Sequence, residues 1–137
     1  RDDIDTGKLA YVGLSWGGQV ASLMIALEPR FRTGILLWGG LVYEGWHASC
    51  DPANFAPRVT IPMLMLNGQE DSIFPYERAQ KPLFKLLGTP NAHKEHLVFP
   101  GGHSIAWEHR RAYLQEISGW LDEYLGPVQS DGVKDRD

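Results

Sequence analysis

The stretch that decides the fold is Gly13-Leu14-Ser15-Trp16-Gly17-Gly18. It lies between a short apolar run and an apolar segment that begins near residue 20, which predicts a strand, a sharp turn and a helix. In a Gly-x-Ser-x-Gly turn the serine takes a strained conformation that lifts its hydroxyl above the sheet, and the flanking glycines avoid a Cβ clash. The amide of Trp16 then points at the oxygen that becomes negative during acyl transfer, helped by the positive helix start.

The motif by itself is a weak signal, because a chain with 15 glycines can contain it by composition alone. The alternative is a glycine-rich turn in which Ser15 only caps the following helix. The surroundings of the motif therefore have to decide between the two interpretations.

Length and composition bound the class of protein. A chain of 137 residues with 43% hydrophobic side chains is long enough for one globular domain with a core. The net charge of -4, with both signs dispersed, argues against a nucleic-acid or anionic-membrane surface. No apolar run reaches the roughly 20 residues that a membrane helix needs. The single Cys50 has no cysteine partner for a disulfide or a metal site, which favours a cytoplasmic setting.

Four apolar runs predict strands, at residues 8–14, 34–38, 61–66 and 95–99. The helix after the first strand has to end at Glu28, since Pro29 disfavours helix before it. Its predicted apolar stripe consists of Val20, Leu23, Met24 and Leu27. Residues 41–58 form a connector. A second helix is predicted from Pro75 to Gly88, with a kink or a division into two short helices at Pro82.

A last helix stops at Gly126, and its predicted stripe consists of Tyr113, Ile117, Trp120, Leu121 and Tyr124. The order of elements predicts an α/β fold of three layers (α/β/α), with about four parallel strands joined by right-handed crossovers. We expect the domain to span residues 1–127 and the polar, acidic tail at 128–137 to be disordered.

Candidate catalytic residues follow three of the four strands. Ligands of an open α/β sheet bind outside the carboxyl ends of the strands, where Ser15, the pair Glu70 and Asp71, and His103 are expected. A serine hydroxyl has to pass its proton to an imidazole as it attacks, and a carboxylate fixes the tautomer of that imidazole. We therefore predict a catalytic triad of Ser15, His103 and Asp71.

Other interpretations of these residues stay open. Asp71 could be a turn or capping residue, and His103 an exposed loop histidine. Glu70 and Glu44 are competing candidates for the acid. His93 and His96 would face opposite sides of an extended strand, which argues against a metal site there. The remaining candidates are rim or surface histidines, His47 and His109, and tryptophans that either line an apolar pocket or belong to the core, Trp16, Trp38 and Trp46.

The chain resembles the C-terminal half of the α/β-hydrolase superfamily, from Ile4 through Gly126. Residues 4–18 are similar to the strand and nucleophile elbow of dienelactone-hydrolase-like and prolyl-oligopeptidase-like members. Residues 61–71 resemble the acid-bearing strand and loop, with Asp71 at the matching position. Gly101-Gly102-His103 resembles the histidine loop.

The resemblance implies a role for each candidate. Ser15 would be the nucleophile, His103 the general base and acid, Asp71 the orienting acid, and the amide of Trp16 one oxyanion donor. This implies a serine hydrolase that cleaves carboxylic esters through an acyl-enzyme, with no cofactor. A peptidase of the prolyl-oligopeptidase type and a non-catalytic hydrolase-like binding domain are the alternatives. Because dienelactone hydrolases proper use a cysteine where this chain has Ser15, their lactone substrate is not implied.

The superfamily places a first half before this region, including the loop that supplies a second oxyanion N–H. We therefore expect a fragment or one piece of a longer protein, whose partner is that missing half. Loss of one oxyanion donor costs about 10² to 10³ in rate, so the 137 residues alone would be feeble. The first strand would be left as an apolar edge. Residues 54–87 also resemble hydrolase domains of large bacterial proteins, some joined to a serine/threonine kinase.

Overall fold

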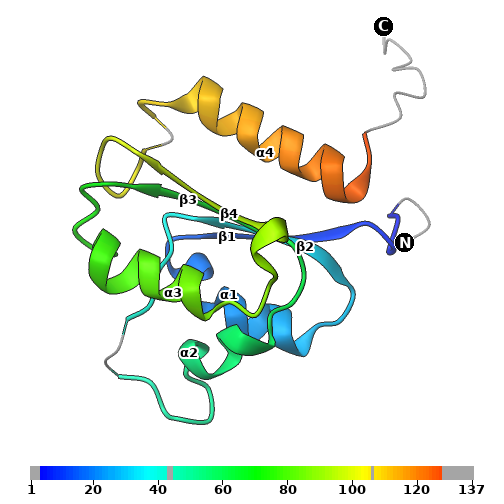
Figure 1. Cartoon of the computed structure of the whole chain (residues 1–137), viewed down its shortest axis with the longest axis horizontal. Helices are drawn as coiled ribbons and strands as arrows, with labels where there is room; N and C mark the ends of the chain where they lie inside the picture. The colour runs from blue at the N-terminus through cyan, green and yellow to red at the C-terminus, as the bar shows by residue number, and fades with distance from the viewer. Residues whose placement is uncertain (1–3, 43–44, 106, 128–137) are drawn as a thin grey trace, which may run out of the picture.

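The computed structural model describes residues 4–42, 45–105 and 107–127. Four strands alternate with helices along the chain (Figure 1). The strands are β1 (Leu9–Leu14), β2 (Phe31–Leu37), β3 (Met63–Gly68) and β4 (Lys94–Phe99). The α-helices are α1 (Trp16–Leu27), α2 (Pro52–Phe55), α3 (Lys81–Leu86) and α4 (Arg110–Leu125). Three short helical segments complete the fold, η1 (Ala56–Arg58), the π-helical η2 (Tyr76–Gln80) and η3 (Asn91–His93).

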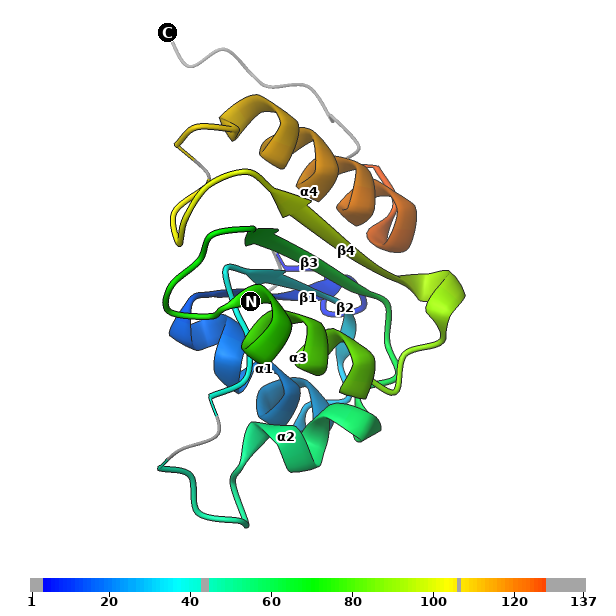
Figure 2. The same ribbon diagram turned by 60° about the vertical axis from the view of Figure 1, so that its left-hand side comes forward.

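The strands form one sheet in the order β1-β2-β3-β4, and all neighbouring pairs are parallel. Helix α4 covers one face of the sheet, while α1, α2 and α3 lie on the other (Figures 1 and 2). The predicted three-layer arrangement with four parallel strands is thereby confirmed. The carboxyl ends of the strands lie at the left of Figure 1, where the loops after β3 and β4 run side by side.

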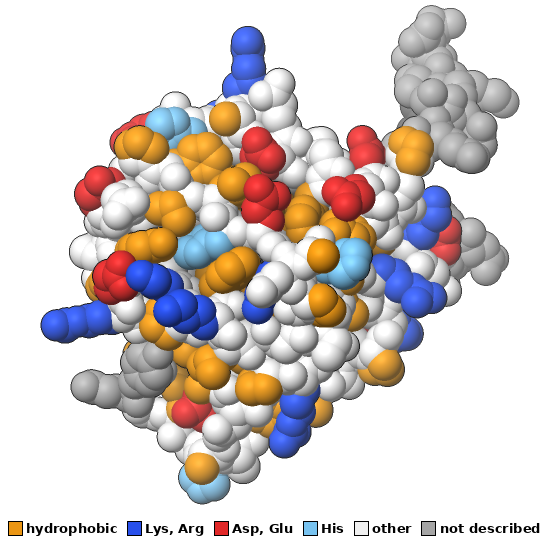
Figure 3. Space-filling view, viewed as in Figure 1, with side chains coloured by type: hydrophobic (Ala, Val, Ile, Leu, Met, Phe, Trp, Pro, Cys, Tyr) orange, Lys and Arg blue, Asp and Glu red, His pale blue; other side chains and the backbone are white. Residues whose placement is uncertain are grey.

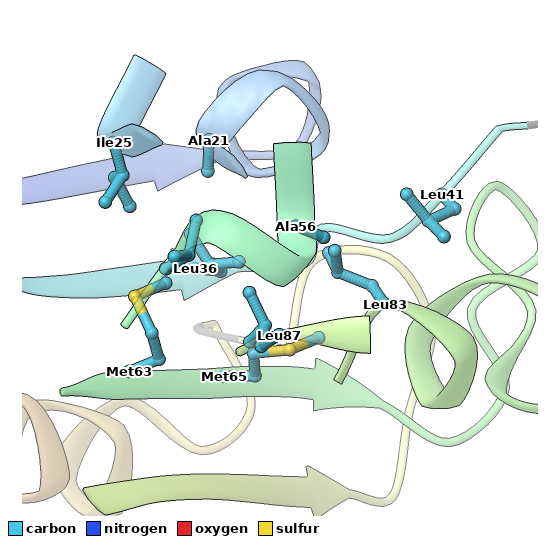
Figure 4. Close-up of a cluster of buried hydrophobic side chains, with 10 residues drawn as sticks. Ala21, Ile25, Leu36, Leu41, Ala56, Met63, Met65, Leu83 and Leu87 are labelled. Atoms are coloured by element: carbon cyan, nitrogen blue, oxygen red, sulfur yellow. The ribbon is translucent and has the colours of Figure 1, made fainter. Parts of the chain in front are cut away.

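The sheet is buried on both faces because the middle of each central strand is a continuous apolar run, residues 35–37 in β2 and 63–66 in β3. Successive side chains of a strand point to opposite faces. Leu36, Met63 and Met65 pack with α1, α2 and α3, in the cluster shown in Figure 4. Their sequence neighbours join the cluster under α4, which consists of Ile35, Leu37, Leu64, Leu66, Ile105, Tyr113 and Trp120. The predicted stripe of the last helix supplies the α4 side of that cluster.

Strand β1 lies at one end of the sheet and, among the described residues, pairs only with β2. Val12 and Leu14 are 48% and 50% exposed, although both are large and apolar. This agrees with the expectation of an apolar edge strand.

The predicted stripe of the first helix is wrong in part. Met24 and Leu27 are exposed, whereas Ala21 and Ile25 pack on the sheet. The helix carries apolar residues around most of its circumference, so spacing alone does not say which side faces the sheet. It also begins at Trp16, before the first residue of that stripe.

Two other expectations need correction. Strand β2 starts at Phe31, three residues before the predicted strand, because Phe31 and Thr33 pair with Leu9 and Ala10 of β1. The buried Thr33 also donates its hydroxyl hydrogen to the carbonyl of Pro62. The connector at 41–58 contains α2 and η1; the side chain of Asp51 caps α2 by accepting from the amide of Ala53 at 2.9 Å.

The predicted division at Pro82 takes the form of a π-helical segment. The N–H of Lys81 donates to the carbonyl of Tyr76, five residues earlier, and α3 begins directly afterwards. Pro82 has no N–H, and its ring would press on the carbonyl four residues before it in a regular α-helix. The wider π-turn precedes the proline, and it ends at the buried Gln80.

The surface agrees with the dispersed charge of the sequence. Figure 3 shows acidic and basic side chains interspersed over the visible face.

Within the described ranges, no helix combines the length and the apolar character that crossing a membrane requires. The predicted disordered tail at 128–137 lies outside the described residues.

Candidate active site

Ser15 occupies the turn between β1 and α1 in a strained conformation. Its φ is 50° and its ψ is -110°, in a region that non-glycine residues rarely adopt. The N–H of Ser15 donates to the carbonyl of Leu37 at 2.7 Å, which ties the turn to the end of β2. The side chain of Ser15 makes no capping hydrogen bond to α1. Its hydroxyl is therefore free to face the loops beyond the sheet.

The sharp turn needs a residue without a side chain at Gly13. A Cβ atom there would overlap the carbonyl oxygen of Gly17. Both flanking glycines were expected to be needed to avoid a Cβ clash, but Gly17 is not. A Cβ on Gly17 would meet nothing closer than the Tyr11 hydroxyl at 4.0 Å. The close approach on that side belongs to Gly18, where a Cβ would lie 2.8 Å from the Cα of Gly39.

A continuous hydrogen-bonded chain joins Ser15, His103 and Asp71. The Ser15 Oγ lies 2.8 Å from His103 Nε2, and His103 Nδ1 lies 2.9 Å from Asp71 Oδ2. An ionised carboxylate only accepts hydrogen bonds, so Nδ1 carries the proton of the neutral ring and Nε2 can accept from the serine hydroxyl. The structure thus brings together the three side chains that the sequence singled out, from the ends of β1, β3 and β4.

Asp71 is held by its own loop. Its side chain is fully buried, and Oδ1 accepts from the backbone N–H groups of Ile73 at 2.8 Å and Phe74 at 3.0 Å. A buried carboxylate is costly unless such partners replace water. Both oxygens of Asp71 are satisfied, one by the backbone and one by His103, which fixes the direction in which the carboxylate points.

Two aromatic side chains enclose the imidazole of His103. The ring of Phe74 lies 5.8 Å from it and the ring of Trp38 lies 6.2 Å from it, centroid to centroid. The His103 side chain remains 21% exposed, so a substrate can reach it. Sequence reasoning gave Phe74 no role. Trp38 was expected only as a pocket or core residue, and its positive φ of 56° has no signal in the sequence.

Of the two rival acids, the structure describes Glu70, whose side chain is bound to the backbone of Gly101. Glu70 is exposed and accepts from the backbone N–H of Gly101 at 2.5 Å, so it joins the acid loop to the histidine loop. Glu44 lies outside the described residues. Asp71 is therefore the acidic residue that the described geometry pairs with the imidazole.

Trp16 is the first residue of α1, where backbone N–H groups have no partner within the helix. Its amide directly follows Ser15, as an oxyanion donor requires, while its indole is 66% exposed. Trp46 is half-buried in the connector. Trp38 lines an open cavity of about 300 Å³ together with Trp107, Arg110, Tyr113 and Leu114.

The other histidines lie apart from this chain of hydrogen bonds. His96 Nε2 lies 3.1 Å from Asn67 Oδ1, and its ring packs against Tyr76 and Phe84 on the α3 side. Burial lowers the pKa of His96 to about 4. His93 lies in η3, before β4 begins, and not on the extended strand that was expected. Its Nδ1 lies 3.3 Å from the Tyr124 hydroxyl of α4, so the two histidines contact different layers of the fold.

His47 and His109 are rim or surface residues. His47 is exposed and its Nδ1 lies 2.8 Å from the Ser49 hydroxyl. The Nε2 of His109 donates to the carbonyl of Pro100 at 2.9 Å, and Pro100 directly precedes the histidine loop.

Comparison with known proteins agrees with this architecture. The protein fold is that of the α/β hydrolases: an acylaminoacyl peptidase of Pyrococcus horikoshii superposes with a TM-score of 0.71 at 17% identity, over 95% of this chain and 26% of the peptidase. The family model of the dienelactone hydrolase family matches residues 1–119. The chain therefore belongs to the dienelactone hydrolase family.

The chain is also similar to one further protein in sequence and to one further protein in structure. A protein of Yersinia pestis assigned as a carboxymethylenebutenolidase is 32% identical over 120 residues, which cover 85% of this chain and 45% of that protein. A cold-adapted esterase from an Arctic intertidal metagenomic library is 27% identical with a TM-score of 0.66, over 86% of this chain and 50% of the esterase. The chain spans about half the length of each.

Proposed function

We propose that this protein is a serine hydrolase that cleaves carboxylic esters through an acyl-enzyme on Ser15. The observation that carries the proposal is the unbroken chain of hydrogen bonds from the Ser15 hydroxyl through His103 to Asp71. Membership of the dienelactone hydrolase family supports a hydrolase, and the esterase among the similar structures favours an ester substrate.

In the proposed reaction Ser15 Oγ attacks the ester carbonyl while its proton passes to His103 Nε2. Asp71 holds Nδ1–H and stabilises the imidazolium that forms. The amide of Trp16 donates to the carbonyl oxygen as it becomes negative. Collapse breaks the bond to the alcohol, which takes the proton from Nε2 and leaves. Water activated by the same imidazole then releases the acid and restores Ser15.

A peptidase is the second candidate, because the similar structures include an acylaminoacyl peptidase. The same three residues would serve either reaction. Turnover of p-nitrophenyl esters compared with peptide p-nitroanilides separates the two activities. A hydrolase-like domain without catalytic activity is the third candidate, and it requires an unreactive Ser15.

Labelling with a fluorophosphonate probe tests the proposal. The protein is expressed at the full length that its gene encodes, with Ser15→Ala and His103→Ala as the test variants. Ser72→Ala is the matched control, because Ser72 is exposed beside Asp71. We expect labelling of the native and control proteins and none of the test variants. Absence of labelling in the folded native protein would refute the serine hydrolase and leave the binding domain.

A comparison with residues 1–137 alone tests whether further polypeptide completes the site. The implied second oxyanion donor lies in the half of the superfamily domain that precedes this region. Where the gene encodes such a segment, we expect residues 1–137 alone to react more slowly by about 10² to 10³. Equal rates would show that one amide suffices.

A further inference from the structure

We propose that Gln80 is a positioning residue for the catalytic acid, an inference that rests on the proposed function. Gln80 is completely buried at the end of the π-helical η2. Its side-chain Nε2 donates to the carbonyl of Gly68 at 2.9 Å and to the carbonyl of Phe74 at 2.7 Å. One amide group therefore bridges the two ends of the segment 68–74, which contains Asp71.

The bridged segment presents two of the groups that contact His103. Asp71 accepts from the Phe74 N–H through Oδ1 and pairs with His103 through Oδ2. The Phe74 ring packs against the imidazole on another side. The Gln80 amide fixes the carbonyl of Phe74, and hence the peptide chain between the carboxylate and the aromatic ring.

The energetic cost of Gln80 indicates a role beyond filling space. Its buried Oε1 has no hydrogen-bond partner among the residues that the structure describes. An unpaired buried polar atom costs free energy that an apolar side chain of the same shape would avoid. The π-helical turn that delivers the residue is also an uncommon structure, which occurs frequently at functional sites. The two hydrogen bonds that Nε2 donates offset this cost, because they fix the loop that carries Asp71.

The test is Gln80→Met, which keeps an unbranched side chain of similar length but removes both donors. Gln69→Met is the matched control, because the Gln69 side chain is exposed in the same loop. With p-nitrophenyl acetate and the full-length protein, we expect Gln80→Met to lower kcat by about 10-fold to 100-fold at unchanged KM. Gln69→Met should leave both values unchanged.

A double-mutant cycle separates positioning from general destabilisation. If Gln80 acts through Asp71, Gln80→Met should lower kcat less than twofold further in an Asp71→Asn background. The same full loss in both backgrounds would overturn the inference, as would a native kcat in Gln80→Met. If that variant does not fold, Gln80→Glu serves instead, because it keeps the shape and turns a carboxyl oxygen toward the two carbonyls. The same loss of kcat at unchanged KM is then expected, and an unchanged kcat overturns the inference.

Failure of the inference is distinguishable from failure of the proposed function. A native protein that neither reacts with the fluorophosphonate nor turns over the ester would refute both. A native protein that reacts, with Gln80→Met reacting at the same rate, would refute the role of Gln80 alone.

Discussion

The Oδ1 of Asn67 lies 3.1 Å from Nε2 of His96. Asn67 is completely buried on β3, and its Nδ2 donates to the carbonyl of Gly39 at 2.9 Å. The Oδ1 must therefore accept, so Nε2 of His96 carries the hydrogen. This side-chain bridge joins β4, β3 and the loop after β2.

The first prediction concerns stability against pH. The pKa of His96 is about 4 in the folded protein, below the ordinary value of about 6.5 expected when unfolded. Between these values the unfolded chain binds the proton and the folded protein does not, so stability is lost as pH falls from 6.5 to 4. The loss from this group is about 3 kcal/mol. Urea unfolding at several pH values measures it, and His96→Gln should flatten that part of the profile. An equally steep profile in the variant would contradict the assignment.

The second prediction separates the two flanking glycines of the elbow. Gly13→Ala should destabilise the protein by about 1 to 3 kcal/mol, because the new methyl group meets the Gly17 carbonyl. Gly17→Ala should stabilise it by about 0.5 to 1 kcal/mol, since the position is helical and open. Urea denaturation of both variants measures the difference. Equal destabilisation by the two substitutions would show that the elbow needs both glycines.

The third prediction concerns the carboxylate. Asp71→Asn keeps the size of the side chain but turns the imidazole toward the wrong tautomer, so kcat for p-nitrophenyl acetate should fall by about 10⁴. Glu70→Gln is the control, and it should change kcat less than tenfold because the Glu70 carboxylate accepts from the backbone N–H of Gly101 and not, among the described residues, from His103. The reverse order of effects would make Glu70 the acid.

The fourth prediction concerns the core under α4. The indole N–H of Trp120 donates to Thr33 Oγ1 at 2.7 Å, and both residues are buried. Thr33→Val should cost about 1 to 3 kcal/mol, because it leaves that N–H without a partner. Trp120→Phe removes the donor, so adding Thr33→Val to it should cost less than Thr33→Val alone. Additive losses in urea unfolding would show that this hydrogen bond contributes nothing specific.

Much of the fold follows from local signals in the sequence. Continuous apolar runs such as Leu64-Met65-Leu66, bounded by turn residues, favour strands buried on both faces. The carboxyl ends of such strands fix where the next polar residues lie, which is why the amino-acid sequence alone selects Ser15, Asp71 and His103. The spacing of α4 is equally informative, because its outer face is polar.

Other features depend on contacts between distant segments. The buried side of α1 does not follow from spacing, since apolar residues surround that helix and only the packed sheet selects Ala21 and Ile25. The sequence also contains no pattern that indicates a role for Gln80. Its role depends on a π-turn and on the carbonyls of Gly68 and Phe74. The spacing of these residues in the sequence does not predict that they meet the Gln80 side chain.

The most direct test of the central claim is to identify the acylated residue during ester turnover. The full-length protein is mixed with p-nitrophenyl acetate, quenched in acid within the first turnover, digested and analysed by mass spectrometry. We predict an acetyl group on the peptide that contains Ser15, absent from Ser15→Ala. Turnover with an acetyl group on another residue, or with none at any time point, would contradict the proposed mechanism.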